Sequence, residues 1–341
     1  IIHYKCPNCG DDMAFDSQSG TLACRSCGRQ DNIAQFPDEY ITNEFSEDEA
    51  VEYECENCGA VVITDQDTTA TSCSFCGAGV VLGDRIVGKL APRKVIPFKI
   101  SKDEARDAFK KWCKNGRFTP PGFMTADRIK NITGMYVPFW MYDLNSKVQL
   151  DAIGKRVRTY TRGDYIYTET KHYDVHRNID MYHRKVPVDA SKKMNDEMMD
   201  KLEPYNYNDL EDFKAPYLVG YLAEKYNYDD KELYPRVEEK IAPFIRSYVN
   251  STVSNYSMVH NRQEQKQTKA LNSMYVLLPV WMVYYDFERQ EHTFAMNGQT
   301  GKVLGKPQIS KKKVAVWYSG IAVSAFVALK LVSFGIGGVL W

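Results

Sequence analysis

Cys6-Pro-Asn-Cys9-Gly10 is the first of four closely similar stretches in this sequence. The other three are Cys24-Arg-Ser-Cys27-Gly28, Cys55-Glu-Asn-Cys58-Gly59 and Cys73-Ser-Phe-Cys76-Gly77. They form two blocks of the pattern Cys-x2-Cys-x14-Cys-x2-Cys, and every cysteine of the second block lies 49 positions after its counterpart in the first. Equal spacing in both blocks indicates a tandem repeat of one small module.

Paired Cys-x2-Cys stretches are typical of zinc ribbons, in which two such turns close a tetrahedral shell of four thiolates at ~2.3 Å from Zn²⁺. The glycine after each pair relieves the positive-φ strain of a backbone folded tightly around a metal. A complete thiolate shell leaves no open position for water or substrate, so we expect structural sites. The predicted ligands are Cys6, Cys9, Cys24 and Cys27 in residues 1–40, and Cys55, Cys58, Cys73 and Cys76 in residues 50–84.

Other uses of the cysteine pairs fit less well. A redox dithiol usually lies at the start of a helix beside a strand. Four cysteine pairs in two equally spaced blocks do not fit that arrangement. Disulfides form in oxidising compartments. The N-terminal end has no apolar segment of the kind that would direct it to such a compartment. Iron in a rubredoxin-like site would use similar turns, and spacing alone leaves zinc and iron both open. We predict two zinc ions per chain.

Charge is unevenly distributed along the 341 residues, although 44 basic side chains balance 44 acidic ones. Residues 1–84 hold three basic and sixteen acidic side chains, a net charge of −13, whereas residues 85–313 carry a net charge of +12. Nucleic-acid binding needs a basic face, because phosphate contacts supply most of its affinity. We therefore expect the acidic N-terminal module to bind protein, with the chain's own basic region as one candidate surface.

Residues 85–310 are predicted to form an α+β region, in which an aromatic stretch occurs twice. Met135-Tyr-Val-Pro-Phe-Trp-Met-Tyr-Asp143 returns as Leu278-Pro-Val-Trp-Met-Val-Tyr-Tyr-Asp286. Each copy follows a candidate strand and a candidate helix. We therefore predict two related strand-helix-strand units, at about 93–145 and 215–306, with Trp140 and Trp281 in the core of a sheet.

The boundaries of these elements follow from local signals. Val95–Ile100 is expected to be a strand, and Ser101-Lys-Asp-Glu104 has the form of a capping box before a helix. A second helix is expected over about 230–254. Between the units, residues 146–190 are predicted to be a β-rich insert, a hairpin that turns at Arg162-Gly163-Asp164.

The C-terminal segment Val314–Trp341 holds one charged residue, Lys330, among 28 residues. A helix needs ~20 apolar residues to cross ~30 Å of hydrocarbon, and Lys330 lies close enough to the far interface for its stem to snorkel. Lys311-Lys-Lys313 precedes the segment, and basic flanks mark the cytoplasmic side. We predict one transmembrane helix over 314–341 in the cell membrane, with the N-terminal domains in the cytoplasm.

The sequence offers little support for catalysis. Residues 83–89 have the spacing of a phosphate-binding loop, but Leu90 has no hydroxyl for Mg²⁺ and Pro92 falls in what should be the following helix. The patterns Gly-x-Ser-x-Gly and His-Glu-x-x-His do not occur. We expect a protein that is not an enzyme and has no small-molecule substrate.

Four stretches outside the cysteine blocks are distinctive: Lys94-Val-Ile-Pro-Phe98, Phe123-Met-Thr-Ala-Asp-Arg128, Gly134-Met-Tyr-Val-Pro-Phe-Trp140 and Met296-Asn-Gly-Gln-Thr-Gly-Lys302. With the cysteine blocks they give the whole chain a resemblance to the YdjG-type membrane proteins of Bacillus and relatives. The resemblance implies an accessory of the PspA envelope-stress system. It further implies that, with a second small membrane protein, the chain recruits an SPFH-domain protein and through it PspA to the membrane. Related sequences are often labelled primosomal helicase-like, but this chain has no helicase motor.

The combined hypothesis is a non-enzymatic, membrane-anchored, zinc-binding adaptor that recruits cytoplasmic partner proteins. One alternative is a membrane-tethered nucleic-acid-binding protein or transcription regulator that uses its zinc ribbons. A second alternative is a redox or zinc sensor.

Overall fold

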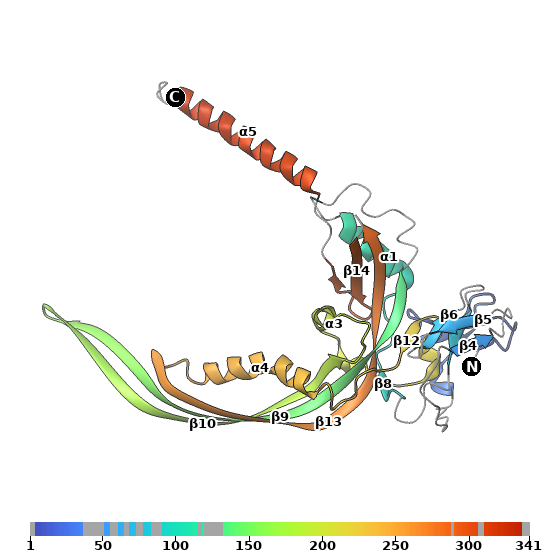
Figure 1. The fold of residues 1–341 in the computed structure, drawn as a ribbon, viewed down its shortest axis with the longest axis horizontal. Helices are drawn as coiled ribbons and strands as arrows, with labels where there is room; N and C mark the ends of the chain where they lie inside the picture. The colour runs from blue at the N-terminus through green and yellow to red at the C-terminus, as the bar shows by residue number, and fades with distance from the viewer. Residues whose placement is uncertain are drawn as a thin grey trace.

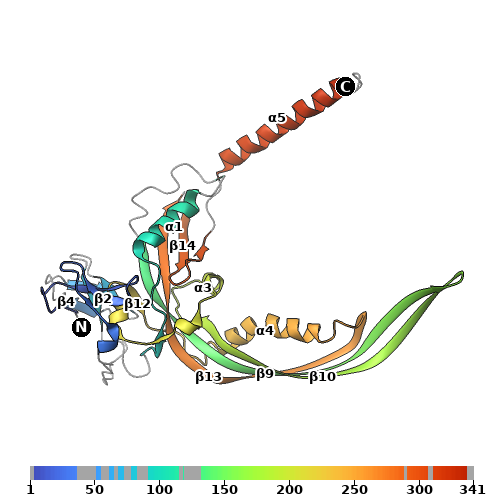
Figure 2. The ribbon, with the colours of Figure 1, turned by 180° about the vertical axis from the view of Figure 1, so that it is seen from behind.

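The computed structural model describes residues 4–36, 51–54, 61–64, 68–72, 78–82, 91–114, 118, 132–287, 290–305 and 310–335. Figure 1 shows a body rich in β-strands, a long curved arm, and the helix α5 (Lys311–Gly335), which extends away from the body. The N-terminal strands lie on the side of the body opposite to the arm, and Figure 2 shows the same arrangement from behind.

The body is built around the antiparallel pairing of β9 (Thr133–Arg162) with β13 (Met258–Phe287), each 30 residues long. The two aromatic stretches meet in this pairing, where Val137 lies opposite Leu278. Alternate side chains of both strands enter two separate hydrophobic cores. Tyr136 and Trp281 belong to one core, whereas Val137 and Leu278 belong to the other. Burial on both faces explains why these stretches are apolar at nearly every position.

Short parallel neighbours flank the two aromatic stretches at matching positions. The strand β12 (Leu222–Glu224) pairs with β9 at Met135 and Tyr136, and β8 (Lys94–Val95) pairs with β13 at Val276 and Leu277. Val276 lies 141 positions after Met135, the same interval that separates Trp281 from Trp140. The two aromatic strands therefore make equivalent contacts. β9 pairs with β12, which lies before the second helix of the chain's repeat, and β13 pairs with β8, which lies before the first.

The remaining strands extend this sheet, which has ten strands within the described residues. They are β11 (Glu211–Asp212) beside β8, β6 (Thr68–Ser72) and β7 (Gly79–Val81) beyond β12, and β14 (Gln290–Asn297) and β15 (Val303–Leu304) beyond β13. Two smaller sheets contain β1 (Met13–Asp16), β2 (Thr21–Cys24) and β3 (Gln30–Asp31), and the pair β4 (Val51–Glu54) and β5 (Val61–Thr64).

Helices cover the body. The helix α1 (Lys102–Lys114) begins with the predicted capping box, because the Ser101 N–H donates to Glu104 Oε2 at 2.8 Å and the Glu104 N–H donates to Ser101 Oγ at 3.3 Å. Its Phe109 packs edge-on against Phe294 at 4.2 Å between centroids. The shorter helical segments are η1 (Ile33–Gln35), α3 (Asp196–Leu202), η4 (Tyr207–Asp209) and η5 (Ala215–Leu218).

The arm is formed by β10 (Tyr165–Asp189), which pairs with β9 back from a turn at Gly163, and by the first half of β13 on the other edge of β9. The positive φ of Gly163, 63°, is the conformation that favours glycine in a tight turn. The helix α4 (Tyr234–Ser251) lies along the concave face of the arm (Figure 1). One stripe of α4 is buried there against β9 and β10: Val237, Ile241, Ile245 and Val249.

The structure differs from the sequence predictions mainly in strand length. The turn at residues 162–164 is where the hairpin was expected, but β9 runs without interruption from the Trp140 stretch into the hairpin. The strand expected over Val95–Ile100 is only Lys94–Val95. Beyond it, the Ile96 N–H still donates to the Leu277 carbonyl at 3.0 Å, and the chain then continues through the buried Phe98 to the capping box without further strand structure. The stretch Phe123–Arg128 lies outside the described residues.

We predict that Ile245→Ala lowers the free energy of unfolding by about 2–5 kcal/mol, because it leaves a cavity between α4 and the arm. The neighbouring Phe244 is 68% exposed, so Phe244→Ala is the matched control and should change stability by less than about 1 kcal/mol. Chemical denaturation of the purified chain measures both values. Equal losses for the two variants would show that α4 does not pack as described.

Candidate metal centre

The first cysteine block forms a compact cluster at the end of the β1–β2 hairpin where β1 begins and β2 ends. Its four sulfur atoms, those of Cys6, Cys9, Cys24 and Cys27, all lie within 4.8 Å of one another. Cys6 and Cys27 are 3.5 Å apart, as are Cys9 and Cys24. A tetrahedral shell with Zn–S bonds of ~2.3 Å would separate its sulfur atoms by about 3.8 Å. The four cysteines are therefore close enough to hold one metal ion.

The backbone forms the same turn at both cysteine pairs. The Gly10 N–H donates to the Cys6 carbonyl at 2.8 Å, and the Gly28 N–H donates to the Cys24 carbonyl at 3.0 Å. Both glycines have positive φ, 76° and 75°, which a residue with a Cβ adopts only with strain. Gly10 and Gly28, which follow the two cysteine pairs of the first block, thus have the conformation that the sequence predicted for them.

The pKa values of two thiols differ in direction. The backbone N–H of Arg29 is the main group that lowers the pKa of Cys27 to about 6. The backbone near Asp11 lowers the pKa of Cys9, but hydrogen bonds to Cys24, Cys27 and Cys6, together with burial, raise it to about 12. Metal binding needs the thiolate form, so a divalent cation would replace the thiol protons and release them. Four sulfur donors around one position fit a metal such as zinc.

The second predicted block lies outside the described residues, which include neither Cys55 and Cys58 nor Cys73 and Cys76. Strands that flank these cysteines are described. The strand β4 ends directly before Cys55, and β6 ends directly before Cys73. The structure therefore brings together the first set of predicted ligands and does not address the second set.

The first cysteine module is seated on the body. The Phe15 N–H donates to the Val219 carbonyl at 3.1 Å, and the Phe15 ring packs edge-on against Tyr217 at 5.4 Å. Lys214 Nζ donates to the Phe36 carbonyl at 2.9 Å. Cys6 and Cys24 are buried in the same hydrophobic core as Phe15, whereas Cys9 and Cys27 are exposed. Aromatic and backbone contacts thus connect the cluster to the sheet.

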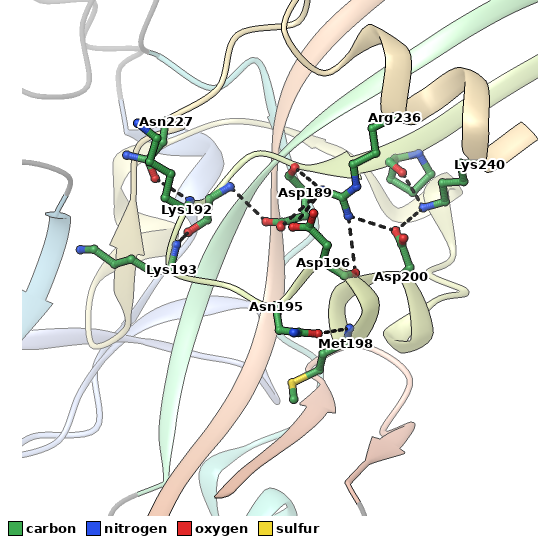
Figure 3. Close-up of polar contacts among 12 residues, drawn as sticks. Asp189, Lys192, Lys193, Asn195, Asp196, Met198, Asp200, Asn227, Arg236 and Lys240 are labelled. Carbon is green, nitrogen blue, oxygen red and sulfur yellow. Dashed lines mark hydrogen bonds and ion pairs between the residues drawn. The ribbon is translucent and has the colours of Figure 1, made fainter. Parts of the chain in front are cut away.

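A second polar site, which the sequence did not single out, joins the end of β10 to α3 and α4 (Figure 3). Asp189 is fully buried, and its Oδ2 lies 3.8 Å from Arg236 Nη1. Arg236 also forms ion pairs with Asp196 at 3.1 Å and Asp200 at 3.6 Å. Lys240 extends the network through Asp200 at 2.8 Å. The only cue in the sequence was an aspartate directly after the apolar Val186-Pro-Val188.

Burial raises the pKa of Asp189 to about 7, although Arg236 and the Ser191 backbone N–H act in the opposite direction. The native state therefore keeps a proton on Asp189 at pH values where the unfolded chain has released it. Stability from this group is fully present below the unfolded pKa and is lost as the pH rises through about 7.

We predict that the melting temperature of the native chain falls between pH 5.5 and pH 8 relative to that of Asp189→Asn, which has no carboxyl group to ionise at this position. Differential scanning fluorimetry of the full chain in detergent measures the two slopes. Asp174→Asn, an exposed change on the same strand, is the control and should keep the native slope. Parallel slopes for the native chain and Asp189→Asn would contradict this assignment.

Comparison with known proteins gives one extensive similarity. YdjG, an uncharacterized protein of Bacillus subtilis (strain 168), is 66% identical over 338 residues, which cover 99% of each chain. No protein-family model matches the chain, and no solved structure matches it.

Proposed function

The chain belongs to the YdjG family of Bacillus proteins, and we propose that it is a non-enzymatic, membrane-anchored, zinc-binding adaptor that recruits cytoplasmic partner proteins to the membrane. The length and apolar surface of α5 support this proposal most strongly. Residues Lys311–Val332 form a helix long and apolar enough to cross a membrane, and none of its most apolar stretch is buried against the rest of the chain. A helix of 22 residues is about 33 Å long, which matches the ~30 Å of a hydrocarbon core.

The proposed orientation places the body in the cytoplasm. Three consecutive lysines, Lys311–Lys313, form the first residues of α5, and an excess of basic residues marks the cytoplasmic side of a membrane span. A reducing cytoplasm also keeps cysteines available as metal ligands, because disulfides do not persist there. The lysines before the span and the chemistry of the cysteines therefore both support a cytoplasmic location of the body.

An adaptor role fits a metal site that is closed. Four thiols surround one position in the first module and would leave a bound ion no open coordination site, so the ion would stabilise the fold. The long arm presents a large surface to partners (Figure 2). By resemblance to YdjG-type proteins, the proposed partners are a second small membrane protein, an SPFH-domain protein and, through it, PspA, during envelope stress.

We further propose that residues 1–40 and 50–84 are tandem zinc ribbons, and that about 93–145 and 215–306 are two related units. Equal cysteine spacing supports the first statement. The equivalent parallel pairings at Met135 and Val276 support the second, since two copies of one unit would place the same motif position beside the same kind of strand.

We predict that the purified chain contains about two zinc ions, one for each set of four cysteines. Cys24→Ser should remove one ion, because three thiolates hold zinc more weakly than four. Cys113→Ser is the matched control, since Cys113 belongs to neither block, and it should keep both ions. Elemental analysis gives the counts. Iron in the native protein, or an unchanged zinc content in Cys24→Ser, would contradict the assignment.

The adaptor proposal predicts that PspA and the SPFH-domain protein sediment with membranes through this chain. The test compares cells with the full chain and cells with a chain truncated after residue 310. Immunoblots of cell fractions should show both partners in the membrane fraction with the full chain and in the soluble fraction with the truncated chain. Both partners should also be present when the chain is affinity-purified, with or without nuclease. Loss of the captured partners after nuclease would favour the nucleic-acid-binding alternative. Absence of both partners from the purified material would contradict recruitment.

A further inference from the structure

The outer end of the arm, residues 155–173, has unusual surroundings. The strand β13 begins opposite Lys155, and α4 lies nearer the body, so only β9 and β10 continue to the turn. We call these residues the distal hairpin. Their backbones pair with each other residue by residue up to Arg162 and Tyr165. The distal hairpin is therefore a two-stranded ribbon in which residues 156–172 are all exposed, while Tyr256 packs against Tyr173 and Arg156 at its base.

Large apolar side chains gather at this end instead of in a core. Exposed fractions reach 71% for Tyr165 and 74% for Ile166, and Val157, Tyr160 and Tyr167 are between 44% and 47% exposed. Cross-strand partners share a face. Tyr160, opposite Tyr167, therefore lies on the face that continues toward α4, whereas Val157 and Ile166 lie on the other face. Apolar groups thus occupy both faces of one ribbon.

Basic side chains surround these apolar groups. The distal hairpin holds five basic residues, Lys155, Arg156, Arg158, Arg162 and Lys171, against two acidic ones, Asp164 and Glu169. Two arginines stack on tyrosines: Arg158 lies 5.8 Å from the Tyr160 ring, and Arg156 lies 5.2 Å from the Tyr173 ring. Tyr160 and Tyr167 stack on each other at 5.5 Å. The Arg158 guanidinium is thereby held beside an exposed ring, whereas that of Arg156 lies over the half-buried Tyr173 and, at the same distance of 5.2 Å, over Tyr256.

These features match an anionic lipid surface better than a protein groove or a nucleic acid. A groove or a stacking platform would cover one face of a ribbon, whereas immersion in the headgroup layer covers both. Tyrosine prefers the membrane–water interface, and arginine and lysine are attracted to anionic lipids within a Debye length. The arm also extends toward the same side of the body as α5 (Figures 1 and 2).

We infer that the distal hairpin is a second membrane contact, whose tyrosines and Ile166 enter the headgroup layer of an anionic membrane while the surrounding arginines bind lipid phosphates. This inference takes from the proposed function that α5 anchors the chain in a membrane. With a contact at each end, the body would be held at a defined tilt instead of rotating about a single tether.

The test places the photocrosslinker p-benzoylphenylalanine at Ile166 in the full chain. The protein is reconstituted in vesicles of phosphatidylglycerol and phosphatidylethanolamine, or of phosphatidylcholine alone. Mass spectrometry should find lipid adducts in the first vesicles, with at least a severalfold loss in the second and in high salt. The control carries the crosslinker at Tyr182, a 65% exposed residue nearer the body on the same strand, and should form few lipid adducts.

A charge variant tests the electrostatic part. Arg156→Gln, Arg158→Gln and Arg162→Gln together should lower lipid adducts at Ile166 by about fivefold for each basic group removed. The matched control removes three exposed basic groups elsewhere on the arm and α4, through Arg246→Gln, Lys266→Gln and Lys269→Gln, and should leave the adducts unchanged. Circular dichroism checks that both variants fold.

Extraction with alkaline carbonate separates this inference from the proposed anchor. Chain that resists extraction yet gives no more lipid adducts at Ile166 than at Tyr182 overturns the inference and leaves α5 as the anchor. Adducts that are equal in phosphatidylcholine, or that form with a second copy of the chain or with added single-stranded DNA, also overturn it. Lipid adducts at Ile166 in a chain that carbonate releases would support the hairpin contact and count against the anchor.

Discussion

The antiparallel pairing of β9 with β13 at Val137 and Leu278 is the contact on which the rest of the structure depends. Each strand places alternate side chains in two cores, and a fully buried apolar side chain contributes about 1.5–3 kcal/mol by burial. A shift of one residue in this register would exchange the two faces and move Trp281 out of its core. The flanking strands β8 and β12, and the hairpins that continue into β10 and β14, all take their positions from this pair.

Curvature of the arm follows from interruptions in the same ladder. β13 shifts register against β9 between His260 and Gln263 and again between Ala270 and Asn272, and β10 shifts between His183 and Val186. An extra residue on one strand bends it and increases its twist. At the last site Lys185 has a φ of 55°, and its N–H donates to Asp143 Oδ1 at 2.9 Å. The concave face that results is the one α4 covers (Figure 1).

Among the described residues, apolar and backbone contacts couple the first cysteine module to this framework. Phe15 contacts the Val219 carbonyl and the Tyr217 ring, and Lys214 donates to the Phe36 carbonyl, while Lys5–Asp12 and Arg29–Asp31 are ion pairs internal to the module. Exposed ion pairs contribute little, about 0–1 kcal/mol, and salt screens them. Burial of the Phe15 ring and of Cys6 and Cys24 is therefore the stronger tether, so the module should stay seated at high ionic strength.

Local signals with a fixed residue pattern were predictable from the sequence. The capping box at Ser101, the turn at Gly163 and the clustering of the first four cysteines each depend on residues that are close together in the chain. The pairing of the Trp140 and Trp281 strands was not predicted, because repetition of a motif does not say which strands lie side by side. The Asp189–Arg236 network was missed for a related reason: its members lie 47 positions apart, and the apolar Val186-Pro-Val188 before the aspartate does not identify its partner.

The topology of the full chain in intact cells is the measurement that best tests the proposed anchoring of a cytoplasmic body by α5. An epitope inserted at Gly163, in the exposed turn of the arm, and a second epitope after Trp341 report the two sides. If α5 is the anchor, antibody reaches the Trp341 epitope on intact protoplasts and reaches the Gly163 epitope only after permeabilisation. Alkaline carbonate should not extract the chain. Antibody binding at Gly163 on intact protoplasts, or release of the chain by carbonate, would contradict this anchoring.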